Sequence, residues 1–417
     1  MTLLILITFA IVYLGMAIGH LPRLRVDRTG IAMLGAIVLL VAGAVTEGAA
    51  IKAIDFPTLF ILLGLMILSA QFALSGFYDW CAWRLANVPW QPEALLAAVV
   101  AVAGGLSALL ANDVVVFAMT PLLCAGLRAR GLDVRPYLIA LAGAANAGSA
   151  ATVIGNPQNI LIGQMGHLGF WRFLFACGVP AFLSLVIVYW VVARVWRGRL
   201  VDANAPPGPT RLNGDGQPPG PPGTWQLSKG LIGVVVLLVA FTTPFPRDVA
   251  VLGIAGCMLV SRRFASRDML GLVDWHLLAL FAGLFILTGA LADTGLPGRL
   301  VDQLAASGLP LDRLPFLGGF SVLASNSIGN VPAVVLLMKV WAHPPEGALY
   351  ALALFSTLAG NLLLPGSLAN IITVERAAAA GVILRFREHA RCGVPMTVLS
   401  LLLAAVWLVA MGFIAVV

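Results

Sequence analysis

Residues 148–159 read GSAATVIGNPQN, and residues 359–370, which lie 211 positions later, read AGNLLLPGSLAN. At this offset Asn159 corresponds to Asn370, and each is preceded by a corresponding glycine. Both copies lie inside strongly apolar segments, where lipid offers no hydrogen bonds. A helix broken by Gly, Pro and Asn at membrane depth is therefore tolerated only where protein or a water-filled cavity satisfies the freed backbone groups. Two matching breaks predict the binding site of a secondary transporter.

The composition is that of a polytopic membrane protein. Of the 417 residues, 60% are hydrophobic and 10% are charged, whereas a soluble protein carries roughly 25% charged residues. The first apolar run, residues 3–19, lacks the basic start and the small-residue cleavage site of a signal peptide, so we expect a retained first span. The sequence therefore predicts an all-α polytopic membrane protein whose environment is the lipid bilayer.

Motifs of catalysis and metal binding are absent from the sequence. It contains no HExxH, GxSxG or Walker motif, and its five cysteines form no CxxC pair. An enzyme therefore has little support, and we expect the cysteines to be packing residues. The basic residues behind the net charge of +7 lie between apolar segments, so we expect them to set membrane topology and not to bind nucleic acid. We expect no cofactor and no metal site, only a coupling ion, H⁺ or Na⁺.

The apolar runs form two similar halves. Each half has five runs of about 20 residues, long enough to span a bilayer. Each also has a further apolar stretch interrupted by polar residues, at 95–127 and 313–340. We interpret these stretches as re-entrant hairpins, with two ordinary spans apiece as the alternative. Because five crossings is an odd number, the second half must be inverted relative to the first. The fold predicted is two inverted repeats with about ten spans, two re-entrant hairpins and two broken helices.

Further matches relate the halves beyond hydropathy. Asp55 corresponds to Asp274 at an offset of 219, and Asn112 to Asn326 at an offset of 214. The offset falls along the chain, as differences in loop length would require. The domains predicted are a first transmembrane repeat at 1–200, a disordered cytoplasmic Pro/Gly-rich linker at 201–228 and a second, inverted repeat at 229–417.

Charge predicts the orientation. In this topology one side holds 19 of the 25 basic residues, and the other side holds 6. The first side, which includes the linker, is therefore expected to be cytoplasmic, and both termini are expected outside. We expect a multi-pass protein of a bacterial-type inner (plasma) membrane. A homodimer is left open as an alternative to a monomer.

Polar residues at membrane depth form the candidate site. Asp113 is the one ionisable residue within the hairpin centres and breaks, and such residues are functional candidates by default. The alternative is that Asp113 caps a hairpin helix. By contrast, Asp274 lies at a predicted span end and is expected to be interfacial. The candidate substrate- or ion-binding residues are Asn112, Asp113, Ser149, Thr152, Gly155, Asn156, Asn159, Asn326, Ser327, Asn330, Asn361, Gly366, Ser367 and Asn370.

Three motifs resemble those of the ion transporter superfamily, specifically the ArsB/NhaD-type permeases and the citrate-transporter-like group. They are ANDVVVFAMTPLL at 111–123, IGNPQNILIG at 154–163 and AGNLLLPGSLANI at 359–371. The resemblance covers nearly the whole chain except the linker. It implies a site made by two hairpin tips and two unwound helices, and a substrate drawn from arsenite, carboxylates or sodium exchanged for protons. The Ser-Asn-Thr sodium signature of the dicarboxylate branch is not clearly present.

The charge of the four polar windows ranks the substrates. Residues 107–120, 146–163, 321–338 and 356–372 contain no Lys, Arg or His. A citrate-like trianion would therefore meet one carboxylate and only helix dipoles, each equivalent to roughly half a charge. We rank export of arsenite, antimonite or a related inorganic anion first. Sodium/proton antiport follows, and cation-coupled di- or tricarboxylate (citrate-like) transport is third. The substrate is expected to be a small inorganic or organic ion.

Overall fold

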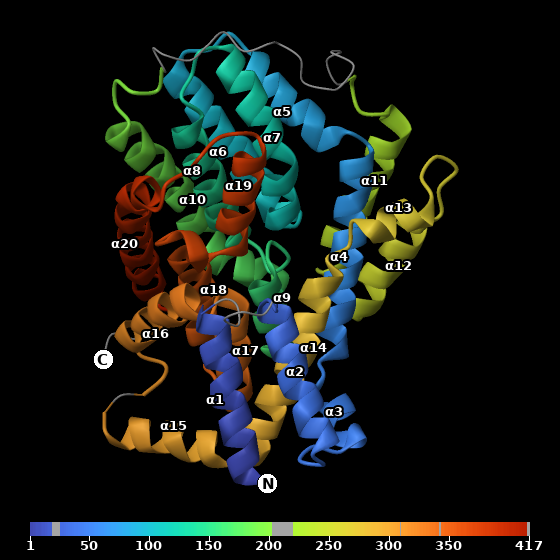
Figure 1. Ribbon diagram of the computed structural model, residues 1–417, viewed down its shortest axis with the longest axis vertical. Helices are drawn as coiled ribbons and strands as arrows, with labels where there is room; N and C mark the ends of the chain where they lie inside the picture. The colour runs from blue at the N-terminus through green and yellow to red at the C-terminus, as the bar shows by residue number, and fades with distance from the viewer. Residues whose placement is uncertain (19–25, 202–219, 309, 342, 415–417) are drawn as a thin grey trace.

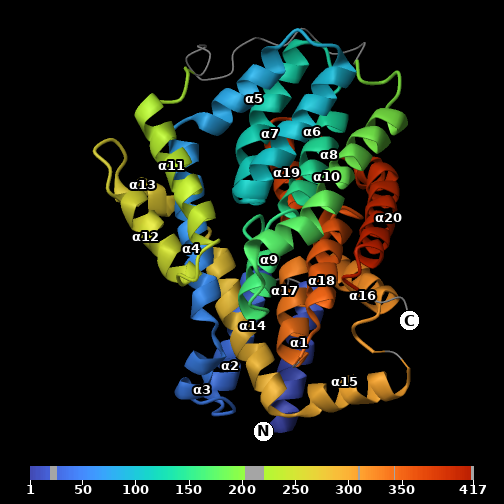
Figure 2. The ribbon, with the colours of Figure 1, turned by 180° about the vertical axis from the view of Figure 1, so that it is seen from behind.

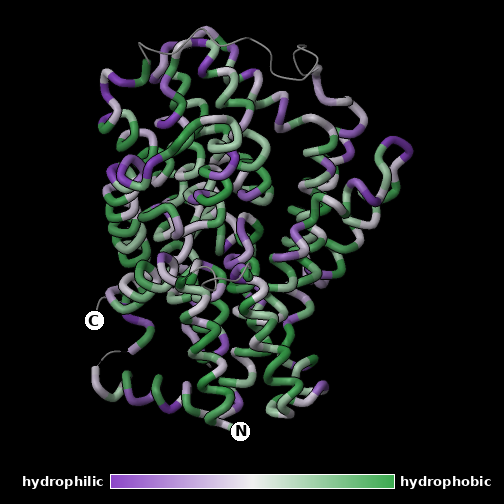
Figure 3. The backbone as a smooth tube through the Cα atoms, viewed as in Figure 1, coloured by the Kyte–Doolittle hydropathy of each residue, from purple (hydrophilic) through white to green (hydrophobic). Residues whose placement is uncertain are grey.

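The structure is a computed structural model that describes residues 1–18, 26–201, 220–308, 310–341 and 343–414. Within these residues it is all-helical apart from one isolated bridge between Leu132 and Val201, so the predicted all-α class is confirmed. Hydrophobic residues cover most of the helices, as Figure 3 shows. Six of the described helices are long and apolar enough to cross a membrane, namely Phe56–Leu74, Pro92–Leu109, Asn112–Ala129, Phe170–Val195, Trp275–Asp293 and Phe386–Ala410.

The described helices follow the same order in both halves, as Figure 1 shows. The helices of the first half are α1 (Thr2–Ile18), α2 (Arg28–Val41), α3 (Glu47–Ala53), α4 (Phe56–Leu74), α5 (Phe77–Asn87), α6 (Pro92–Leu109), α7 (Asn112–Ala129), α8 (Val134–Ser149), α9 (Pro157–Met165) and α10 (Phe170–Val195). Those of the second half are α11 (Thr224–Ala240), α12 (Arg247–Leu259), α13 (Ser266–Gly271), α14 (Trp275–Asp293), α15 (Leu296–Ala306), α16 (Leu314–Ser327), α17 (Asn330–Val340), α18 (Glu346–Ala359), the 3₁₀ turn η1 (Leu364–Gly366), α19 (Leu368–Ala379) and α20 (Phe386–Ala410).

Matching local signals set the helix ends in both halves. Asp55 and Asp274 N-cap α4 and α14, and their Oδ1 atoms accept hydrogen bonds from backbone N–H groups at 3.0 and 2.9 Å. At the other end of each helix stands a glycine in the left-handed region, Gly76 with φ 78° and Gly295 with φ 69°. Glycine adopts this conformation without steric cost. The same chemistry therefore turns the chain from α4 into α5 and from α14 into α15.

The helices form a frame and a core. In the frame, α4 packs against α11 and α12, and α14 packs against α1 and α2. In the core, the hairpins and broken helices pack with α10 and α20. The amphipathic helices α5 and α15 lead from frame to core at opposite ends of the molecule (Figure 1). Frame and core meet where α4 contacts α9 and where α14 contacts α17, and α9 and α17 themselves lie side by side (Figures 1 and 2).

The predicted linker is only partly described. Most of residues 201–228 fall in 202–219, outside the described residues. Its last five residues, Thr224 to Ser228, instead belong to α11. Lys229, which follows these residues in α11, donates to the carbonyl oxygens of Met258 (3.1 Å) and Val260 (2.7 Å) at the end of α12. α10 ends and α11 begins at the upper end of Figure 1, whereas α1 begins at the lower end. Which end is cytoplasmic stays a prediction.

The structure corrects one detail of the predicted alignment of the hairpins. α6 ends at Leu109 and α7 begins at Asn112, whereas α16 ends at Ser327 and α17 begins at Asn330. The tips are therefore related by 218 positions and not by 214, so Asn112 corresponds to Asn330. Asn326 lies in the last turn of α16. The offset of 214 came from a coincidental match of residue types, because the sequence alone did not show where the hairpin helices end.

The two hairpins enter the molecule from opposite ends, with the tip of α6–α7 approached from above and that of α16–α17 from below in Figure 1. We therefore expect Asn112→Cys and Asn330→Cys, each in a background without the five native cysteines, to react with a membrane-impermeant maleimide from opposite sides. Removal of Cys257 matters most, because it is exposed. Labelling of both positions from one side alone would contradict the inverted repeat.

Candidate substrate and ion site

The first broken helix is held open by its own polar side chains. Asn159 in α9 donates through Nδ2 to the carbonyl oxygens of Ser149 (3.2 Å) and Thr152 (3.0 Å). Asn156 N-caps α9, and its Oδ1 accepts from the backbone N–H of Asn159 at 2.9 Å. Its Nδ2 donates to Ser149 as well. The backbone groups freed by the break are thus satisfied inside the protein, as membrane depth requires.

The second broken helix repeats this arrangement 211 positions later. Asn370 in α19 donates through Nδ2 to the carbonyl oxygens of Gly360 (2.8 Å) and Leu363 (3.1 Å). Ser367 N-caps α19, and its Oγ accepts from the backbone N–H of Ala369 at 3.2 Å. The sequence predicted the breaks, and the structure shows that the two repeated asparagines serve as caps for the freed carbonyl groups.

Each broken helix also supports the other. Asn146 in α8 accepts from Ser367 Oγ (2.8 Å) and donates to Asn361 Oδ1 (2.8 Å). Thr357, which occupies the corresponding place in α18, accepts from Asn156 Nδ2 at 3.2 Å. The two cross-contacts tie the repeats together at the centre of the core. Asn146 and Thr357 were not among the predicted site residues.

Asn361 is also part of this buried network. Its Nδ2 donates to the carbonyl oxygen of Gly143 (3.2 Å), and its own carbonyl oxygen lies 3.1 Å from His389 Nε2. Asn361 and His389 are both buried. Each polar atom of the Asn361 side chain therefore has a partner inside the protein, and Asn361 stabilises the second break.

Hydrogen bonds tie each hairpin to the broken helix of its own repeat. Thr152 Oγ1 donates to the carbonyl oxygen of Ala108 in α6 at 2.5 Å. In the second repeat, Ser325 Oγ donates to Ser356 O (3.3 Å) and Asn326 Nδ2 donates to Ala359 O (2.9 Å). These bonds bring each hairpin tip to its break.

A small cavity of ≈ 50 Å³ lies where the first hairpin tip meets the first break. Asn112 and Asp113 from the tip and Gly155 and Asn156 from the break line it, together with Asp274 from the frame. The volume is sufficient for water or one small ion. α7 begins without any side-chain cap hydrogen bond. Asp113 is therefore not the helix cap that the alternative interpretation proposed, and its carboxylate is available to the cavity.

Asp274 was expected to be interfacial, and the structure corrects this expectation. The short helix α13 precedes it and brings the start of α14 against the first hairpin tip, so that Asp274 lines the same cavity as Asp113. Its Oδ1 still caps α14 by accepting from Leu277 N at 2.9 Å. Two carboxyl groups therefore share one small cavity.

The second tip and break present amide oxygens without partners. The Oδ1 atoms of Asn326 and Asn330 are buried and accept no hydrogen bond within the described residues, and Asn159 Oδ1 in the first break is in the same state. The Nδ2 of Asn330 lies 3.0 Å from the position that a Cβ on Gly360 would take, so Asn330 reaches the break. Ser327 is exposed instead. Because consecutive helical residues point about 100° apart, Ser327 turns away from the face of Asn326.

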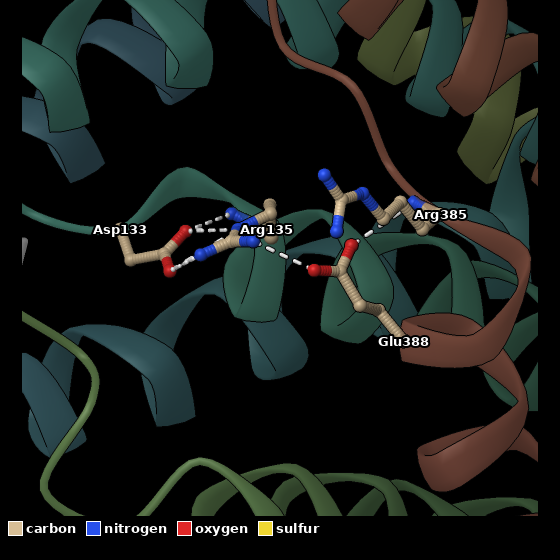
Figure 4. Close-up of polar contacts among 4 residues, drawn as sticks. All are labelled: Asp133, Arg135, Arg385 and Glu388. Atoms are coloured by element: carbon tan, nitrogen blue, oxygen red, sulfur yellow. Dashed lines mark hydrogen bonds and ion pairs between the residues drawn. The ribbon is translucent and has the colours of Figure 1, made fainter.

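A larger cavity of ≈ 280 Å³ lies at the end of the molecule that carries the linker. Figure 4 shows the ion pairs beside it: Arg135 in α8 contacts Asp133 (2.6 Å) and Glu388 of α20 (2.6 Å). Glu388 also accepts from the backbone N–H of Arg385 at 3.0 Å. These groups satisfy one another, so they fasten α8 of one repeat to α20 of the other. The hairpins and breaks, where three buried amide oxygens lack partners, are the better candidate site.

Comparisons with known proteins agree with this architecture. The model of the citrate transporter family (CitMHS) matches residues 4–359. The chain is 31% identical over 379 residues to inner membrane protein YbiR of Escherichia coli, covering 86% of this chain and 88% of YbiR. It is 27% identical over 464 residues to the silicon efflux transporter LSI3 of Oryza sativa, with 94% of each chain covered.

The fold is also that of a solved membrane transporter. The crystal structure of the YdaH transporter of Alcanivorax borkumensis superposes with a TM-score of 0.59 at 16% identity, over 99% of this chain and 98% of that one. At this identity the likeness concerns the fold alone. The class of membrane transporter follows from the family model, which matches most of the chain. The chain belongs to the citrate transporter family of the ion transporter superfamily.

Proposed function

We propose that this protein is a secondary active transporter that exports a small hydroxylated oxyacid, such as arsenite or antimonite, in exchange for protons. The observation that carries the proposal is that the site combines two features. Buried amide oxygens lack hydrogen-bond donors, and a small cavity is lined by two carboxyl groups. Asn159, Asn326 and Asn330 offer buried acceptors that lack donors. The hydroxyl groups of an oxyacid supply such donors, and a buried acceptor without a partner costs about 1–3 kcal/mol.

Asp113 is proposed as the proton carrier. Its carboxyl group faces the small cavity beside Asp274. Two carboxylates that share a poorly hydrated site cannot both remain charged without cost, so the site favours uptake of one proton or one small cation. Exchange of that proton would couple the ion gradient to movement of the substrate.

A relative supports the substrate class. LSI3, similar over 94% of this chain, is named a silicon efflux transporter. Silicic acid and arsenous acid are both small, weak acids whose oxygens carry hydroxyl protons. We therefore extend the class of hydroxylated oxyacid, and the outward direction, to this chain as a proposal.

Two alternatives rest on the same atoms. Buried amide oxygens and a carboxylate also suit Na⁺, which favours sodium/proton antiport as the second candidate. Cation-coupled transport of di- or tricarboxylates is third, because a multivalent anion would meet Asp113 and Asp274 in the first cavity.

A strain deleted for the gene and complemented with it distinguishes the three functions. Restored tolerance of arsenite and antimonite supports the proposal. Rescue of sodium or lithium tolerance alone, or of growth on carboxylates alone, supports the corresponding alternative.

We further propose a bacterial-type inner membrane as the location, with the linker in the cytoplasm and both termini outside. The excess of basic residues at the linker end supports this orientation.

A further inference from the structure

Arg28 brings a positive charge to the second hairpin tip from outside the core. It opens α2 in the frame, and its Nε donates to the carbonyl oxygen of Met16 at the end of α1 (3.2 Å). Its Nη1 lies 3.3 Å from the position that a Cβ on Gly329 would take. Gly329 has φ 99° and immediately precedes Asn330. A glycine at this place gives the guanidinium close access to the tip.

The guanidinium of Arg28 has no carboxylate partner within the described residues. The ion pairs recorded there involve Arg135 and Arg172. The neighbouring Asp27 uses its Oδ1 to cap α2 by accepting from Gly30 N at 2.8 Å. Arg28 is only partly exposed, and an unpaired charge in such a place carries a desolvation cost that a bound anion would offset.

The hairpin residues near Gly329 in the sequence restrict the chemistry of that anion. Asn326 and Asn330 present buried amide oxygens that need hydrogen-bond donors. A small metal cation would match these oxygens but would be repelled by the guanidinium. A bare anion would match Arg28 but leave the oxygens unsatisfied. An anion that also carries hydroxyl protons satisfies both.

The two tips therefore differ in charge although the repeats are related. The first tip faces Asp113 and Asp274, and the second faces Arg28. The repeat-related arginine, Arg247, does not take the place of Arg28 at the first tip. It donates to the carbonyl oxygen of Leu168 at 2.7 Å and lies over the ring of Phe241 at 5.4 Å.

From this geometry we propose that Arg28, with Asn326 and Asn330, forms a subsite for the singly charged, hydroxyl-bearing conjugate base of an oxyacid. The first tip then binds the coupling proton, and the second tip binds the substrate. This inference rests on the proposed function and names the charge state of its substrate at one of the two tips.

The test is exchange of radiolabelled arsenite across proteoliposomes with equal pH and equal total arsenite on both sides, which removes any driving force. Charge-assisted hydrogen bonds contribute about 1.5–3 kcal/mol, and 1.4 kcal/mol corresponds to a factor of ten. We therefore expect Arg28→Gln to raise the KM for arsenite about 10-fold or more with little change in the maximal rate. Arg28→Lys should fall between, because lysine keeps the charge but lacks the planar fork.

Arg247→Gln is the matched control, since it removes a repeat-related arginine that is bonded elsewhere, and we expect its KM to be unchanged. Bicarbonate is a hydroxylated monoanion near neutral pH, so it should compete with arsenite in the wild type and cease to compete in Arg28→Gln. Stabilisation of purified protein by sodium arsenite, measured as a rise in Tm, should be lost in Arg28→Gln and kept in Arg247→Gln.

The possible failures are distinguishable. If the wild type exchanges arsenite but Arg28→Gln keeps its KM, or if Arg247→Gln raises KM equally, the Arg28 subsite is wrong and the proposed function stands. If folded wild-type protein exchanges neither arsenite nor silicic acid, both the proposed function and the subsite are wrong. Competition by bicarbonate that persists in Arg28→Gln would also contradict the subsite.

Discussion

Replacing Asp113 with asparagine is expected to abolish proton-driven transport while leaving the protein folded and inserted in the membrane. Asparagine has nearly the same shape as aspartate but cannot exchange a proton. Asp113 lines the first cavity, and α7 begins without a side-chain cap hydrogen bond, so the substitution removes no cap. We expect accumulation against a gradient to fall to background, with Tm close to that of the wild type. The measurement is uptake into proteoliposomes with an imposed pH gradient.

Asp302→Asn is the control for this result, because Asp302 is an exposed carboxylate on α15 and its loss should not affect uptake. Asp274→Asn should reduce coupling as well, since Asp274 lines the same cavity. Wild-type uptake and an unchanged pH dependence in Asp113→Asn would show that this carboxyl group does not carry the coupling proton.

Replacing Gly155 with alanine is expected to have the second large effect, because the added methyl group overlaps the backbone within the first break. A Cβ at this position would lie 2.2 Å from the carbonyl oxygen of Ser149, which ends α8. This overlap is with backbone and cannot be relieved by rotating a side chain. Overpacking of this kind costs about 1–3 kcal/mol, so we expect a clear drop in Tm and at least a 10-fold loss of transport. Thermal unfolding and exchange assays on the same preparation measure both effects.

Gly105→Ala is a suitable control, because Gly105 lies in α6 and a Cβ there would meet nothing within 4 Å. Gly366→Ala is a graded case in the second break. Its Cβ would lie 2.4 Å from Asn326 Oδ1 and 3.0 Å from Gly360 O. Because the Asn326 side chain can move, we expect a smaller loss of stability but still a loss of transport. A Gly155→Ala protein as stable and active as Gly105→Ala would mean that the break is not held as described.

The broken helices and hairpins could be predicted from sequence because their signals are local. Gly, Pro and Asn within an apolar run disrupt a helix wherever the run is placed, and the repeat at 211 positions identified both copies. The correspondence between the two hairpins was predicted less well, because it rested on two matching residue types. The helices α7 and α17 begin at Asn112 and Asn330, which changes the offset between the hairpins by four positions. Asn146 and Thr357 also lie 211 positions apart, but their different residue types concealed the match.

The charged groups at the tips could not be predicted from the same windows. Arg28 and Asp274 belong to the frame, and they come close to the hairpin tips only in the folded protein. The four polar windows contain no Lys, Arg or His, but Arg28, which lies outside them in the sequence, brings a positive charge to the second tip. A site formed between two bodies of a transporter depends on tertiary contacts that local sequence does not encode.

The most direct test of the account is uphill transport by the purified protein. Proteoliposomes are loaded with one buffer, diluted into another to impose a pH gradient, and given equal arsenite concentrations on both sides. We predict net movement of arsenite against its own gradient, driven by the pH difference and eliminated by a protonophore. Movement that only equalises concentrations, whatever the proton or sodium gradient, would identify a passive pathway and contradict secondary active transport.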